Sequence, residues 1–218
     1  TLFAMPEVSI GFFPDVGGTH MLSRMPGGTG AFLAMSGGRL KWADCLHVGF
    51  LSHTVESARM GELLEALAAA DHPGPVVEAF RVDPGAAPLA GRRAAIDRIF
   101  TGDDASAILA RLEAEEGPDG DWAKALAAEI SAKSPTSVAI ALRQVRIGGS
   151  LSFEDGMRTE YRIVSRILQG RDFYEGVRSV LIDRDNRPSW HPATLAEVSP
   201  AEIEAHFTTI PADGDLAV

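Results

Sequence analysis

Cysteine, basic side chains and long apolar runs are all scarce in this sequence of 218 residues. The single cysteine, Cys45, excludes an internal disulfide and is typical of proteins from a reducing compartment. No apolar run reaches the roughly 18 residues that a membrane-spanning helix needs, so we expect no membrane as a partner. Lysine and arginine total 20 against 30 aspartates and glutamates, and the net charge of −10 argues against nucleic acid as a partner.

Motifs for a metal or a nucleotide cofactor are also absent. No histidines or cysteines have the spacing of metal ligands, there is no Walker-type loop, and the glycines follow no dinucleotide-binding fingerprint. We therefore expect no metal site and no cofactor. The sequence contains no internal repeat, no initiating methionine and no signal or transit segment.

The stretch with the clearest chemical pattern is residues 5–18, which read MPEVSIGFFPDVGG. Glu7 and Asp15 stand there among apolar residues, and a carboxylate in an apolar wall is costly unless it is paired, hydrogen-bonded or protonated. Such surroundings shift a pKa towards neutrality, which general acid–base chemistry needs. Gly17 and Gly18 open a predicted helix over residues 16–25, so we expect free backbone N–H groups to point into the same region.

A purely structural interpretation of these acids stands beside the catalytic one. Asp15 is a good capping residue for the predicted helix over residues 16–25. Glu7 fits an exposed position at the end of a short strand. Two acids at this spacing are a weak signal, and the spacing alone does not choose between the two interpretations.

The same stretch resembles the central signature of the crotonase (enoyl-CoA hydratase/isomerase) superfamily, and within it the 3-hydroxyisobutyryl-CoA hydrolases. Ordinary enoyl-CoA hydratases usually carry glycine where this sequence has Asp15. The resemblance extends over most of the chain, through the runs LAMSGGRL (33–40), AD (43–44), VGFLSH (48–53), KSPTS (133–137), RQ (143–144), EYR (160–162), DFYEGVRSVLIDRD (172–185) and PSW (188–190).

The resemblance implies an α/β fold of the crotonase spiral type, incomplete here, with a predominantly helical C-terminal part. It implies a single domain over residues 1–218, with a core remnant at 1–58, helices and Pro/Gly-rich loops at 59–133, and a helical segment at 134–218. The upstream half of the family fold supplies the oxyanion-hole donors. We therefore expect the chain to be the C-terminal part of a larger protein, and a poor catalyst by itself.

The implied activity is hydrolysis of the thioester of a short branched 3-hydroxyacyl-CoA in valine catabolism. Glu7 matches the catalytic glutamate, as nucleophile or as base, Asp15 matches the acid that binds the substrate hydroxyl, and Gly17 and Gly18 are expected to bind substrate. Coenzyme A enters only as part of the substrate. An enoyl-CoA hydratase or dienoyl-CoA isomerase of the same superfamily remains an alternative, as does a non-catalytic fragment or subunit.

The expected partners are an acyl-CoA, the N-terminal half or another crotonase chain, and further copies in a homo-oligomer. The composition looks bacterial and favours a cytoplasmic protein, or a mitochondrial matrix protein if the source is eukaryotic. Because the chain is acidic, CoA phosphates need local basic residues, and the candidates are Arg24, Arg39, Lys41, Arg143, Arg146, Arg171 and Arg184.

Local signals predict most elements. The apolar run 2–5 and residues 50–55 read as strands, and residues 71–91 read as loop because of their prolines and glycines. Ser134, Ser152 and Ser199 stand where N-caps of three C-terminal helices are expected, two of them followed by proline.

Overall fold

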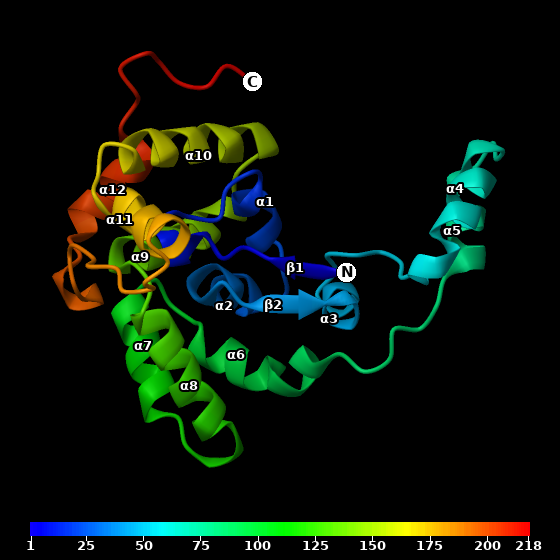
Figure 1. Cartoon of the computed structure of the whole chain (residues 1–218), viewed down its shortest axis with the longest axis horizontal. Coiled ribbons are helices and arrows are strands. Elements are labelled where there is room, and N and C mark those ends of the chain that lie inside the picture. Colours follow the sequence, from blue (N-terminus) through cyan, green and yellow to red (C-terminus); the bar gives the residue numbers. More distant parts are fainter. The chain divides into compact units, whose positions relative to one another are not determined.

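A computed structural model describes all of residues 1–218 and is mainly helical (Figure 1). It divides into a smaller unit, residues 1–3 and 40–92, and a larger unit, residues 4–39 and 93–218. None of the helices combines the length and the apolar character needed to cross a membrane.

The smaller unit contains most of the single two-stranded sheet and five short helical elements. Its elements are β1 (Leu2–Ala4), β2 (Arg39–Lys41), α3 (Trp42–His47), η2 (Ser57–Arg59), α4 (Met60–Ala68), α5 (Pro73–Phe80) and η3 (Pro88–Arg92). The predicted strand near the N-terminus is confirmed, and it pairs with β2, a partner that the sequence did not predict.

Two predictions for the smaller unit are wrong. Residues 50–55 form no strand, because no strand pairs with them: the single sheet contains only β1 and β2. Thr54 instead exchanges hydrogen bonds with Val82. The stretch 71–91 is not all loop, since α5 begins at Pro73. Pro73 and Pro75 lie in its first turn, where backbone N–H groups have no partner within the helix, so these prolines begin a helix rather than break one.

The larger unit is a layered set of helices. Its elements are η1 (Glu7–Ile10), α1 (Gly18–Leu22), α2 (Thr29–Ser36), α6 (Arg93–Ile99), α7 (Ala105–Ala114), η4 (Gly117–Asp119), α8 (Gly120–Ser131), α9 (Pro135–Gly148), α10 (Phe153–Ile167), α11 (Asp172–Val177), the π-helical turn η5 (Arg178–Ile182), η6 (Leu195–Glu197) and α12 (Pro200–Thr208).

Buried apolar residues organise this unit around α2 and α9. Every residue of α2 is buried, and α9 packs along it. A second cluster joins Phe13 to Ile140 of α9, Ile163 of α10 and Phe207 of α12. Since Phe13 lies between the two acids in sequence, burying it ties their segment to the C-terminal helices.

The predicted N-caps of the C-terminal helices are confirmed. The Ser134 hydroxyl accepts from the N–H of Ser137, and the Ser152 hydroxyl accepts from that of Asp155. Ser199 caps α12 in the same way. Each cap satisfies a backbone donor that the first turn of a helix leaves free.

Two glycines bring the late block 172–185 against the first motif. A side chain at Gly176 in α11 would place its Cβ well under 3.0 Å from the backbone of Ile10 in η1, and one at Gly11 would meet the backbone of Asp172 as closely. Only glycine allows backbones to approach so near. The two most distinctive blocks of the sequence, far apart along the chain, therefore pack directly on each other.

An ion-pair network fixes the end of this late block. The Arg178 guanidinium pairs with Glu175 at 2.9 Å, with Asp183 at 2.7 Å and with Asp185 at 2.8 Å. Hydrogen bonds from Arg178 hold the pKa of Glu175 at about 2 and that of Asp185 at about 2. This network links the end of α11 to the residues that follow it, and it pairs four charged residues of the block with one another.

Candidate active site

Glu7 begins the short helix η1 and is partly buried. Its Oε2 atom is shielded from solvent and has no hydrogen-bond partner. Burial raises the pKa of this carboxyl; a hydrogen bond from the residue's own backbone lowers it in part, and the charge of Asp15 raises it further. A carboxylate with one oxygen shielded from water and without a hydrogen bond is a stronger base than a fully exposed one.

Asp15 does not cap the following helix. The N-cap of α1 is Gly17, and the Asp15 side chain accepts no hydrogen bond from the first turn of this helix. Only the backbone carbonyl of Asp15 does so, from the N–H of Gly18 at 2.8 Å. The alternative interpretation of Asp15 as a helix cap is therefore wrong. Its carboxylate makes no hydrogen bond in the chain and raises the pKa of Glu7 through its charge, so the two acids act on each other electrostatically.

The expectation of free backbone donors at the glycine pair is also wrong. The N–H groups of Gly17 and Thr19 each donate to the carboxylate of Glu160 at 2.9 Å, and that of Gly18 donates to the backbone carbonyl of Asp15. A substrate-binding role for Gly17 and Gly18 stays a prediction, but their N–H groups are already engaged.

Sequence reasoning assigned no role to Glu160 or Gln144. Both residues are buried, and both contact the segment that carries Asp15. Glu160 does so from α10. Gln144 lies on α9, and its side-chain amide donates to Pro14 O and Thr19 Oγ1. The only available signal was that both residues lie in runs that carry the family resemblance. Their partners are more than 120 residues away in the sequence, so no local pattern could have indicated the contact.

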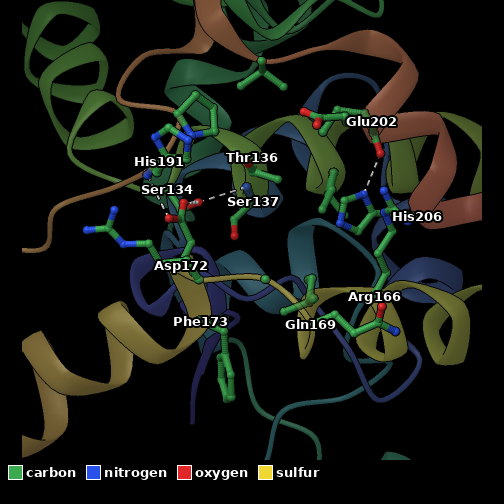
Figure 2. A pocket seen from close by; sticks show the side chains of 18 of the residues that line it. Ser134, Thr136, Ser137, Arg166, Gln169, Asp172, Phe173, His191, Glu202 and His206 are labelled. Atoms are coloured by element: carbon green, nitrogen blue, oxygen red, sulfur yellow. Dashed lines mark hydrogen bonds between the residues drawn. The ribbon is translucent and has the colours of Figure 1, made fainter.

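A cavity in the larger unit is not lined by the two acids. It encloses about 860 Å³ between the start of α9, the end of α10, the start of α11 and α12. Figure 2 shows Asp172 at its wall, held by the Ser134 hydroxyl at 2.7 Å and by the N–H of His191 at 2.9 Å. On the far side, His206 Nδ1 lies 2.8 Å from the carbonyl oxygen of Glu202.

These groups are hydrogen-bonded to one another or to the backbone, and no histidine ring of the cavity is hydrogen-bonded to a serine or threonine hydroxyl. Burial lowers the pKa of His206. Glu7 and Asp15 are not among the lining residues, although Gly11, just after η1, is one. We therefore place the candidate active site at the two acids, where Glu7 Oε2 has no hydrogen-bond partner, rather than at this cavity.

The basic residues considered for CoA phosphates fall into two groups. Arg24 donates to backbone carbonyls, Arg146 does so as well, and Arg143 pairs with Glu204 at 3.1 Å. These three serve the fold. Arg184 likewise donates to a backbone carbonyl, that of Leu181. The side chains of Arg39, Lys41 and Arg171 make no hydrogen bond or ion pair within the chain and stay candidates for a phosphate contact.

Comparison with known proteins identifies the family. Residues 1–207 match the enoyl-CoA hydratase/isomerase family. The chain belongs to this family. The resemblance read from residues 5–18 and from the late blocks is therefore confirmed.

Curated members of the family include three similar proteins with one shared name. The 3-hydroxyisobutyryl-CoA hydrolase of Xenopus laevis is 37% identical, over 96% of this chain and 56% of that protein. The human protein is 36% identical over the same shares, and 3-hydroxyisobutyryl-CoA hydrolase 1 of Arabidopsis thaliana is 33% identical over 99% and 60%. The chain thus spans under two thirds of the length of these relatives. The Xenopus and human proteins are named as mitochondrial; no relative named here supports a cytoplasmic location.

Solved structures of the family share the fold but carry other names. A carnitinyl-CoA dehydratase from Mycobacterium thermoresistibile superposes with a TM-score of 0.88 at 40% identity, over 97% of this chain and 60% of that one. An enoyl-CoA hydratase from Rhodobacter sphaeroides superposes with a TM-score of 0.83 at 33% identity, over 100% and 62%. The predicted crotonase-type fold, largely helical in this part, is confirmed. The subdivision at residues 58 and 133 stays a prediction.

Proposed function

We propose that the protein containing this chain hydrolyses the thioester of 3-hydroxyisobutyryl-CoA or a similar short 3-hydroxyacyl-CoA. The observation that supports this most is the pair of acids. Glu7 has a carboxylate oxygen without a partner and a raised pKa, and Asp15 beside it has a carboxylate that no backbone group occupies.

In this proposal Glu7 acts from its ionised form. As a base, it takes a proton from water while the water oxygen adds to the thioester carbonyl; the C–S bond then breaks, and CoA leaves as the protonated thiol. As a nucleophile, it adds to the carbonyl itself and expels CoA, and water then hydrolyses the mixed anhydride. Both routes give the free acid and CoA, and each requires an unprotonated Glu7.

Asp15 supplies the preference for a hydroxyl group. Its free carboxylate is an acceptor for the substrate 3-hydroxyl, and a site built to accept such a hydrogen bond rejects an acyl group that lacks it. Donors for the developing oxyanion must come from elsewhere, because the N–H groups at 17–19 are engaged. An oxyanion donor is typically worth about 3–4 kcal/mol in the transition state.

The proposal includes no cofactor besides the CoA of the substrate, and it places the reaction in valine breakdown. Homo-oligomers and a role for the remaining part of the protein in completing the site belong to the same proposal. The shared name of the curated relatives supports the substrate class.

A second candidate function is hydration or dehydration of an acyl-CoA, which the names of the two solved structures favour. The two activities are separated on one preparation of the full-length protein, by following release of the free thiol from 3-hydroxyisobutyryl-CoA and hydration of crotonyl-CoA side by side. The proposal expects the larger kcat/KM for thiol release. A larger value for hydration would assign the protein to the second class.

A further inference from the structure

The segment between the two acids and helix α1 has a strained backbone. Val16 adopts a φ of 49°, a left-handed conformation that is rare for a β-branched residue, and Gly17 follows with a φ of 91°. The Val16 side chain is 83% exposed, so its own packing does not hold this conformation. Strain of this kind persists only where surrounding contacts impose it, and it concentrates at functional sites.

Two buried side chains impose the conformation from helices far along the chain. The Glu160 carboxylate, on α10 and only 4% exposed, accepts one N–H on each oxygen, from Gly17 and from Thr19, at 2.9 Å each. The Gln144 amide, fully buried on α9, donates to Pro14 O at 2.5 Å and to Thr19 Oγ1 at 2.6 Å. The contacts lie on both sides of Asp15, so its backbone is fixed from each end.

An ordinary helix cap does not account for this arrangement. Caps are normally local Ser, Thr, Asp or Asn side chains. Asp15 stands two residues before the N-cap Gly17, yet its carboxylate is left free while a buried carboxylate from α10 accepts the N–H groups. Burying Glu160 is costly unless hydrogen bonds compensate, and the two N–H bonds provide that compensation. Glu160, which is distant in sequence, thus caps the helix, and the Asp15 carboxylate remains available to bind substrate.

We propose that Glu160 is a positioning residue that holds the Asp15 carboxylate in place for the substrate 3-hydroxyl, and so sets the preference for 3-hydroxyacyl thioesters. This rests on the hydrolase function proposed above. Glu160 itself touches no substrate and acts only through the backbone at Gly17 and Thr19. Gln144 supports the same segment from its other side.

The test uses the Glu160→Gln variant of the full-length protein. The amide keeps one acceptor oxygen and turns an NH2 donor towards the second backbone N–H, so one of the two bonds is lost and replaced by repulsion. We measure kcat and KM for 3-hydroxyisobutyryl-CoA and for isobutyryl-CoA, which lacks the hydroxyl. The ratio of the two kcat/KM values should fall at least about tenfold, mainly through kcat for the hydroxylated substrate.

Three further variants keep the result interpretable. Glu154→Gln changes an exposed glutamate on the same helix that has no hydrogen bond, and it should leave both activities unchanged. Glu160→Asp keeps two acceptor oxygens and should recover part of the ratio, and it replaces Glu160→Gln if that variant does not fold. In a Glu160→Gln, Asp15→Asn double variant the ratio should fall no further than in Asp15→Asn alone, because both changes remove one interaction.

The opposite results would overturn the inference. A Glu160→Gln variant with a lower Tm but an unchanged substrate ratio would make Glu160 a structural cap and nothing more, and so would fully additive losses in the double variant. If the wild-type protein releases no CoA, the hydrolase proposal fails separately. The same variants are then compared in the hydration of crotonyl-CoA, which creates a 3-hydroxyl; a tenfold fall in kcat with an unchanged Tm supports the positioning role, and an unchanged kcat refutes it.

Discussion

Replacing Glu7 by glutamine should remove turnover and at the same time make the fold slightly more stable. The Oε2 atom of Glu7 is shielded and unpartnered, and burial raises the pKa of the group. A buried polar group without a partner costs about 1–3 kcal/mol, more for a charge. The residue is partly exposed and glutamine keeps two polar atoms, so we take the lower end, about 1 kcal/mol. In the full-length protein this corresponds to a rise in Tm of at most about 2–4 °C, the range typical of a domain of 150–250 residues.

The loss of activity should be far larger than this gain. Removing a catalytic carboxylate commonly lowers kcat by at least about 100-fold, or about 2.7 kcal/mol of transition-state stabilisation. The full-length protein is assayed for thiol release at 25 °C and for thermal unfolding at pH 7, with Glu154→Gln as a matched exposed control.

The pH dependence fixes the sign of the stability effect. The pKa of Glu7 is raised above its ordinary 4.5 in the folded state, so its favourable contribution is complete below 4.5 and is lost as the pH rises through the folded value. The advantage of Glu7→Gln should therefore be absent at pH 4 and present at pH 7. A variant that unfolds several degrees earlier yet keeps turnover would show that Glu7 is structural and would refute this reasoning.

Three further predictions follow from the same contacts. Asp15→Asn should lower the rate of thiol release at least about tenfold, or about 1.4 kcal/mol. It should change Tm by less than about 2–4 °C, since the side chain caps no helix. A large loss of Tm with normal turnover would contradict this. Glu175 has a pKa of about 2 against an ordinary 4.5, so its contribution to stability is complete above pH 4.5 and is lost as the pH falls towards about 2. The difference in unfolding free energy between wild type and Arg178→Leu should therefore shrink as the pH falls from 4.5 to about 2. A constant difference would argue against the ion pair as its source. Gly176→Ala places a Cβ against the backbone of η1 and should lower the free energy of unfolding by about 1–3 kcal/mol and reduce turnover. In Gly61→Ala the new Cβ meets no atom, so this variant should be as stable as wild type or more stable. Equal effects of the two substitutions would contradict the close approach at Gly176.

Local signals predicted the helix ends well. Ser134, Ser152 and Ser199 cap the helices that the sequence assigned to them, because a cap is decided within three or four residues. The strand at residues 50–55 failed for the opposite reason: a strand needs a partner, and β1 pairs with β2 instead.

The candidate site could be predicted only in part. Glu7 and Asp15 were found because they share one short apolar motif, and the family they indicated is confirmed. Their catalytic roles stay predictions. Glu160 gave no signal of its own, because its two bonds to Gly17 and Thr19 join residues 143 and 141 positions apart. Only packing of α10 beside α1 reveals that the cap is distant and that Asp15 is left free.

The most direct test of the central claim is the pH profile of kcat/KM for release of CoA from 3-hydroxyisobutyryl-CoA by the full-length protein. If an ionised Glu7 performs the reaction, the profile falls on its acid side with an apparent pKa above the ordinary 4.5, because burial and the charge of Asp15 both raise it. In Asp15→Asn this apparent pKa should decrease, and in Glu7→Gln the acid limb should disappear from the residual activity. An acid limb at or below 4.5 that neither substitution moves would contradict the account.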